Sequence, residues 1–323
     1  MSWKRCLKTL SASWPPFVTT GEINVHGIIV DDRADGESSL TEREFIAAID
    51  APSVPDRSLI SLKTYYEDVS GGRLRIGNVT AERFEVVGNG GSNDGIYEQF
   101  FRGALSAGRV FRPRTHFMFA LNKRGASATH RNVVLNFDAS MPNPSTLIHE
   151  FGHNLGLMHA TTVSSDRGDT SDRMGATSGF MEFNAPNLVF LNWLDDSAIG
   201  RIESTGVFQL TPLVSSNVQV GLPRVLLVPI SDSNFLYLSV RQRSGRYDSF
   251  HLPIRYDEKL SIHTRMLDAH GNPKKTCLLA VLGEGDQFQL SDRRLLTNYC
   301  SVCVTNRERR SGSFNVHIDI KSL

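Results

Sequence analysis

The stretch HEFGHNLGLMH, residues 149–159, places three histidines, one glutamate and one glycine at fixed offsets. His149 and His153 are four residues apart, so on a helix both imidazoles leave the same face, one turn from each other. Two imidazoles on one face can hold a small divalent ion between them. Glu150 need not ligate that ion, and it can reach a water molecule next to it.

Gly156 allows the chain to change direction at the end of the helix. A helix that continued past Gly156 would carry His159 away from the ion. Because glycine readily adopts a positive φ, the chain can turn here and bring His159 back as a third nitrogen ligand. Three neutral nitrogens leave one tetrahedral position open, as a catalytic zinc site requires. The alternative is a helix with core histidines, which we disfavour because five positions match together.

The helix that carries the motif has a clear predicted start. In MPNPSTLI, residues 141–148, Asn143 is a suitable N-cap and Pro144 suits the first helical position. We therefore expect a helix from there to about Asn154.

Before this helix, segments with strand and helix patterns alternate, which predicts a mixed α/β sheet. Ser39 or Thr41 is the expected cap of the first helix. The predicted strands cover 23–30, 73–79, 83–88, 116–121 and 132–137, and the predicted helices cover 39–49, 58–69 and 95–108.

After about residue 200 the pattern changes to short strands separated by turn residues, which predicts an antiparallel β-sandwich. We therefore predict two domains, 1–200 and 201–323. The strands of the second domain are expected at 207–213, 224–230, 235–240, 260–264, 277–282, 301–305 and 314–320.

The composition argues against a nucleic-acid-binding protein and against a membrane-spanning one. A formal net charge of +1 gives no global field for nucleic acid, and no apolar run reaches the length of a membrane span. Residues 1–18 show no recognisable signal peptide, because Lys8 and several serines interrupt any apolar region. Cys277, Cys300 and Cys303 leave open one disulfide in a secreted protein, and no second ligand pair supports a zinc knuckle there.

The motif HExxHxxGxxH resembles the zinc signature of the metzincin metallopeptidases, which also carry a methionine in a tight turn beneath the metal. Here GDTSDRMGATSG, residues 168–179, supplies Met174 as the expected Met-turn residue. Met181 is the second candidate, but the Asp-x-Met-Gly context favours Met174.

Within that clan the chain is most similar to the gametolysin-like peptidases, the M11 family. The supporting segments, besides the motif and Met-turn, lie at 62–76, 183–194 and 236–250. The resemblance implies an α/β (α+β) metzincin-like catalytic domain with a twisted mixed sheet and an active-site helix. It also implies bound Zn²⁺, a protein or peptide substrate and an extracellular location. The chain departs from the family in lacking an evident signal, pro-segment or PRCGxPD cysteine switch.

We therefore predict a zinc-dependent endopeptidase with Glu150 as general base, acting on an extracellular or cell-wall protein. One alternative is a glycan- or polymer-binding protein, with a structural or inactive zinc domain and a C-terminal domain that contacts glycan or cell wall. Another is a zinc hydrolase that acts on a non-peptide amide. Neither nucleic acid nor a membrane span is expected.

Two segments are expected to contact substrate. The resemblance to the metzincins implies that residues 122–137 supply an edge strand, to which the substrate backbone adds as an extra strand. Phe180, Met181 and Phe183 follow the Met-turn and would give the pocket past the cut a preference for bulky apolar side chains. The alternative is that these three belong to the core beneath the turn.

Overall fold

The structure is a computed structural model. It describes residues 18–32, 38–50, 60–87, 92–112, 114–121, 127–129, 134–138, 144–176, 179–214, 221–231, 234–267, 273–290, 298–308 and 313–322.

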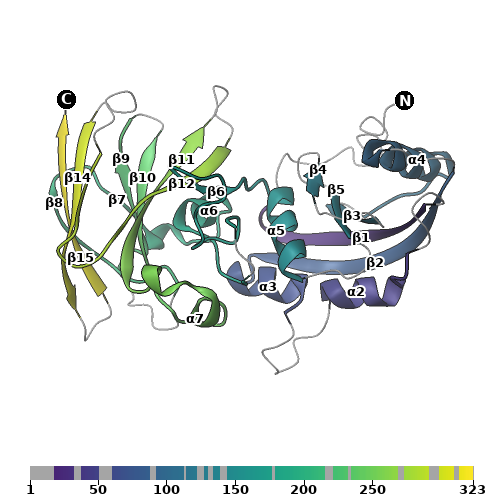
Figure 1. Ribbon diagram of the computed structural model, residues 1–323, viewed down its shortest axis with the longest axis horizontal. Helices are drawn as coiled ribbons and strands as arrows, with labels where there is room; N and C mark the ends of the chain where they lie inside the picture. Colours follow the sequence, from purple (N-terminus) through teal and green to yellow (C-terminus); the bar gives the residue numbers. More distant parts are fainter. Residues whose placement is uncertain are drawn as a thin grey trace. The chain divides into compact units, whose positions relative to one another are not determined.

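The chain divides into two compact units, Met1–Gly156 and Leu157–Leu323, which we call the N-terminal and C-terminal units (Figure 1). The division falls inside the histidine motif, earlier than the domain boundary predicted near residue 200.

The N-terminal unit contains a five-stranded mixed sheet with helices, which confirms the predicted α/β character. Four strands are parallel and one edge strand, β4, pairs antiparallel with β5. In spatial order the strands are β2 (Leu74–Val86), β1 (Gly21–Asp32), β3 (Thr115–Leu121), β5 (Val134–Asp138) and β4 (Ser127–Thr129).

The segments predicted as two strands at 73–79 and 83–88 form the single strand β2, because β1 pairs with it from Leu74 to Val86. β2 lies at an edge of the sheet, where Thr80, between the two apolar segments, is exposed. The pattern-based prediction also missed β4.

The helices of this unit are α2 (Glu42–Asp50), α3 (Leu62–Val69), α4 (Asn93–Ser106) and α5 (Pro144–Asn154). Of the two predicted caps of α2, the structure selects Thr41. Its Oγ1 accepts a hydrogen bond from the Glu44 backbone N at 3.2 Å, and Glu44 Oε2 accepts one from the Thr41 N at 2.9 Å. This reciprocal pair is a capping box.

Strand β1 is buried on both faces, as is typical of a parallel strand covered by helices. Ile28 and Val30 share a hydrophobic cluster with aromatic residues of α4 and β3. A Cβ on Gly27, which precedes Ile28 and faces the other side of the strand, would lie 2.3 Å from the ring of Phe45 in α2. The glycine therefore allows α2 to pack closely against the opposite face.

Helix α5 is anchored by α3. The Tyr66 hydroxyl donates a 2.6 Å hydrogen bond to the carbonyl oxygen of Ile148, and its ring contacts Phe151 with centroids 5.1 Å apart. His116 in β3 packs against Phe151 from a fully buried position, with centroids 5.0 Å apart. These contacts fix the helix that carries the first two histidines.

The C-terminal unit contains two sheets that share one hydrophobic cluster. The β-sandwich itself stays a prediction for this unit. The six-stranded sheet has the order β6 (Ala160–Thr162), β12 (Pro273–Leu282), β11 (Lys259–Leu267), β10 (Phe235–Arg241), β9 (Val225–Pro229) and β7 (Ile199–Arg201). The four-stranded sheet has the order β13 (Gln287–Leu290), β14 (Asn298–Glu308), β15 (Ser313–Ser322) and β8 (Gly206–Leu210).

The six-stranded sheet is not wholly antiparallel. Both of its edge strands, β6 and β7, come from the segment before residue 202 and pair in parallel with their neighbours. The described part of this unit also has two short helices, α6 (Ala185–Phe190) and α7 (Asp248–His251), and 3-10 turns at Asp196–Ala198 and Ile254–Tyr256. Among the described residues, no helix is long and apolar enough to cross a membrane.

Candidate metal centre

Helix α5 begins at Pro144 and ends at Asn154, as the sequence predicted. The expected cap, Asn143, lies outside the described residues. His149 and Glu150 are both 8% exposed. The rings of His149 and His153 lie 5.1 Å apart between centroids, at an interplanar angle of 86°.

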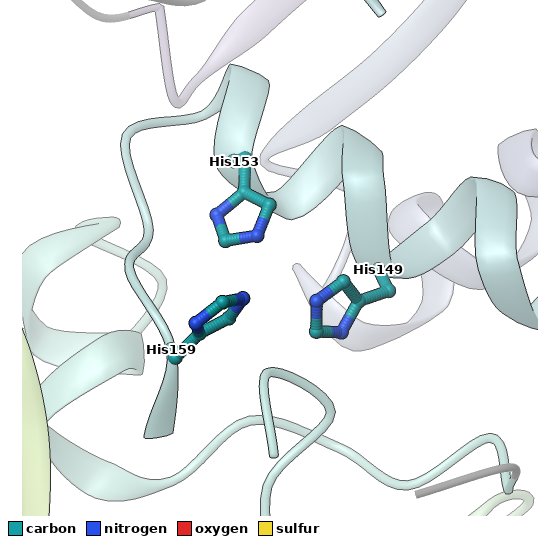
Figure 2. A group of neighbouring side chains, drawn as sticks. All are labelled: His149, His153 and His159. Carbon is teal, nitrogen blue, oxygen red and sulfur yellow. The ribbon is translucent and has the colours of Figure 1, made fainter. Parts of the chain in front are cut away.

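The chain leaves the helix at Gly156, whose φ is 90° and whose backbone N donates to the His153 carbonyl oxygen at 2.9 Å. A positive φ of this kind is the conformation that ends many helices. Beyond it, the ring of His159 points towards the other two histidines (Figure 2). One ligand atom from each of the three residues lies within 4.8 Å of the others.

This donor set suits zinc. Zn²⁺ accepts imidazole nitrogens at about 2.0–2.1 Å, so nitrogens around a tetrahedral ion lie about 3.4 Å apart. That spacing is compatible with the 4.8 Å limit observed for His149, His153 and His159. Three protein ligands with a fourth position open form a catalytic rather than a structural zinc site.

The segment that follows His159 is bonded to the predicted Met-turn residue. The Ala160 backbone N donates to the carbonyl oxygen of Met174 at 3.0 Å, and the Asp169 N donates to the Ala160 carbonyl oxygen at 3.3 Å. The Met174 side chain is fully buried. The turn at Met174 therefore supports the backbone next to the third histidine directly.

Two buried carboxylates hold this turn. Asp172 accepts hydrogen bonds from the backbone N of Met174 and Asn184 and from the Asn187 side-chain amide. Asp169 accepts from the Ser171 backbone N at 3.0 Å and lies 3.0 Å from His263 Nε2. Asp172 thus joins the turn to the start of α6, and Asp169 joins it to β11.

The two carboxylates differ in pKa. Burial raises the pKa of Asp172 to about 6, and the nearby charge of Asp169 adds to this effect. Burial also opposes ionisation of Asp169, but hydrogen bonding and the charge of His263 lower its pKa below the usual value. Asp169 therefore carries the negative charge most readily. The sequence did not predict the role of Asp169, because His263 is 94 residues away from it.

A second buried pair lies beside this network. Arg241 and Asp248 form an ion pair with both side chains buried. Arg241 Nη1 also donates to the carbonyl oxygens of Ser171 and Phe183, at 2.9 and 3.3 Å. Arg241 therefore fixes the backbone on both sides of the Met174 turn.

The three predicted pocket residues differ in burial. Met181 and Phe183 are fully buried, as the core alternative expects, and Phe183 contacts Trp193 with centroids 5.8 Å apart. Phe180 is half-buried, and its ring lies 5.6 Å from that of His251. Phe180 is thus the member of the three that can face a substrate.

Of the cysteines considered for a disulfide, Cys277 and Cys303 are free thiols. The side chain of Cys300 lies outside the described part of the chain. Burial raises the pKa of the Cys277 thiol, so this group is a weaker nucleophile at neutral pH than an ordinary cysteine.

The sequence was compared with protein families, curated proteins and solved structures. Residues 125–268 match the gametolysin peptidase M11 family. This confirms the predicted resemblance, and the family that matches is one of metallopeptidases. The matched segment contains the histidine motif and the Met174 turn, and it continues to β11.

The other comparisons add little. No curated protein matches the chain. A crystal structure of wild-type OgpA from Akkermansia muciniphila is similar over 93% of this chain and 93% of that one, with 11% identity and a TM-score of 0.31. A similarity this low supports no inference about fold or function.

Proposed function

We propose that this chain is a zinc-dependent endopeptidase in which His149, His153 and His159 hold the metal. The observation that carries the proposal is the convergence of three ligand atoms within 4.8 Å, in a segment that matches a peptidase family. When bound, zinc supplies a Lewis acid that makes a water molecule more acidic and polarises the scissile carbonyl.

Glu150 is the proposed general base. It takes the proton from the water that attacks the scissile carbonyl and passes that proton to the leaving amine. A carboxylate has no function next to His149 in a purely structural zinc site, whereas hydrolysis requires a base there. Its placement on the same buried turn of α5 supports this role.

Substrate is proposed to bind along β4. This strand is the edge of the five-stranded sheet beyond β5, and it lies within the segment 122–137 expected to supply an edge. An extended peptide can add to such an edge through backbone hydrogen bonds, with side-chain pockets giving specificity. We propose that Phe180 lines the pocket past the cut and favours bulky apolar side chains. A peptide-library profile that shows a charge preference there would exclude this.

The experiment that tests the proposed function is substitution of the base. Glu150→Gln should keep about one zinc per chain and lose about 10²- to 10⁴-fold in peptide cleavage, which is the usual contribution of general base catalysis. Metal content and cleavage of a proteome-derived peptide mixture are measured on the same preparation. Turnover at the wild-type rate in the variant would refute the role of Glu150.

A chelator separates the two function classes considered. The wild-type chain should lose cleavage with chelator and regain it with added zinc. A chain that binds zinc but cleaves no peptide would instead support the polymer-binding alternative. Mass spectrometry of the products distinguishes peptide-bond hydrolysis from attack on another amide. The gametolysin family is extracellular, and we propose an extracellular or cell-wall protein as substrate.

A further inference from the structure

The side chain of the third histidine contacts two charged residues. His159 Nδ1 accepts a hydrogen bond of 3.4 Å from Arg167 Nε, and Asp166 Oδ2 lies 3.7 Å from the same nitrogen. Nδ1 is thus the nitrogen that faces this charged loop, and we assign Nε2 to the metal.

The carboxylate of Asp166 is itself anchored to the sheet. Its other oxygen, Oδ1, accepts a hydrogen bond of 2.7 Å from the Nζ of Lys275. Lys275 lies on β12, the strand that pairs in parallel with β6 directly after His159. The carboxylate of Asp166 and the backbone that follows His159 are therefore both held by β12.

Asp166 and Arg167 require opposite states of the imidazole. A neutral imidazole carries one proton, so a hydrogen bond donated by Arg167 to Nδ1 places that proton on Nε2. Nε2 then has no lone pair for a metal. A carboxylate that accepts a proton from Nδ1 leaves the lone pair on Nε2. Metal-bound histidines usually donate their other N–H to a carboxylate, a carbonyl or water.

We propose that Asp166 is a positioning residue of the metal centre, whose carboxylate accepts the Nδ1 proton of His159 and directs Nε2 towards the metal. The proposal rests on the proposed function, because it assumes that the three histidines bind zinc. It requires the separation of 3.7 Å to shorten to about 2.9 Å, a normal hydrogen-bond distance. In this arrangement Lys275 holds Asp166, and Arg167 does not bond to Nδ1.

A purely structural role of Asp166 makes a different prediction. The side chains of Asp166 and Lys275 are 55% and 41% exposed. Exposed ion pairs of this kind contribute at most about 1 kcal/mol to stability. If Asp166 served only to pair with Lys275, its loss would change stability slightly and zinc affinity not at all. Zinc affinity is therefore the readout that separates the two roles.

The test compares Asp166→Asn with Asp196→Asn in the full-length chain. Asp196 is an exposed acid of the same unit, so its substitution removes the same charge. Zinc affinity is measured by competition with a chromophoric chelator at fixed pH. Loss of a carboxylate partner of a ligand typically costs 10- to 100-fold in metal affinity. We expect about tenfold for Asp166→Asn, because the site is half-exposed, and less than about twofold for Asp196→Asn.

Two further variants test the neighbours of the Asp166 carboxylate. Lys275→Met should weaken zinc binding in the same direction but less than Asp166→Asn, and Arg167→Met should not weaken it. Thermal unfolding of the zinc-free variants checks that each one is folded. Wild-type affinity in both Asp166→Asn and Lys275→Met overturns the inference. If the wild-type chain binds no zinc, or His159→Ala binds it normally, the proposed function fails instead.

Discussion

His149 and His153 stand almost perpendicular to each other, at 86°, with ring centroids 5.1 Å apart. Rings stacked face to face would direct their nitrogens along parallel lines. Perpendicular rings one helical turn apart can instead direct one nitrogen each to a common point, and the third ring faces the same point (Figure 2). The geometry of α5 thus lets two of the three ligands address the same point.

Removal of one of these ligands should abolish tight metal binding. Zinc content of purified His153→Ala should fall from about one per chain to below about 0.1, because two nitrogens do not complete a zinc site. Elemental analysis after dialysis measures this. His317→Ala, which removes a half-buried histidine of β15, serves as the control and should keep its zinc. Equal zinc content in the two variants would contradict the assignment.

Gly175 should tolerate no side chain. A Cβ at this position would lie 1.9 Å from the carbonyl oxygen of Asp169, which is backbone and cannot rotate away. Gly175→Ala should therefore lower the free energy of unfolding by about 1–3 kcal/mol, the usual cost of overpacking. It should also weaken zinc binding, because the turn supports the residue next to His159.

The matched control for this substitution is Gly103→Ala in the interior of α4. There an added Cβ meets no atom within 4 Å, and the backbone is helical. The substitution should stabilise the chain by up to about 1 kcal/mol, because alanine is the better helix former. Urea unfolding measures both variants. If the two alanines change stability equally, the close approach at Gly175 is not real.

His116 should make the zinc-free chain sensitive to acid. Burial lowers the pKa of His116 from 6.5 to about 3, so between these values the unfolded chain binds a proton that the folded chain does not. Stability from this group is complete above pH 6.5 and falls as pH decreases towards 3. The loss at pH 5 should reach about 2 kcal/mol at most, from about 1.4 kcal/mol per pH unit.

His116→Phe removes the titrating group and keeps an aromatic ring against Phe151. The difference in unfolding free energy between pH 7 and pH 5 should be smaller in the variant by up to about 2 kcal/mol. Both proteins are measured with chelator present, so that loss of zinc at low pH does not contribute. An identical pH dependence in the two proteins would show that His116 does not titrate as described.

Truncation at the predicted domain boundary should destroy the metal site. A chain that ends at Gly200 lacks β12, the strand that pairs with β6 directly after His159. It also lacks His263, the partner of the buried carboxylate of Asp169. We expect this fragment to be insoluble or to bind zinc at least 100-fold more weakly, measured by chelator competition. Full affinity in the fragment would support the boundary at residue 200.

The sequence predicted those helices, strands and caps that depend on residues close to one another in the chain. Helix α5 could be placed because its proline start, its histidines four residues apart and its glycine turn lie within thirteen residues. Most strands and helices followed from periodicity and from caps such as Thr41. The single strand β2 was predicted as two, because pairing with β1 outweighs a polar interruption in the local pattern.

Ligand spacing on a helix is a local property, so the histidine motif alone predicts which residues can bind a metal and which family the central segment resembles. The contacts that hold the third ligand in place become visible only in the folded chain. His263 is 94 residues from Asp169, and Lys275 is 109 residues from Asp166. Such pairs form because strands distant in sequence become neighbours in a sheet, and no local pattern encodes which strands will pair.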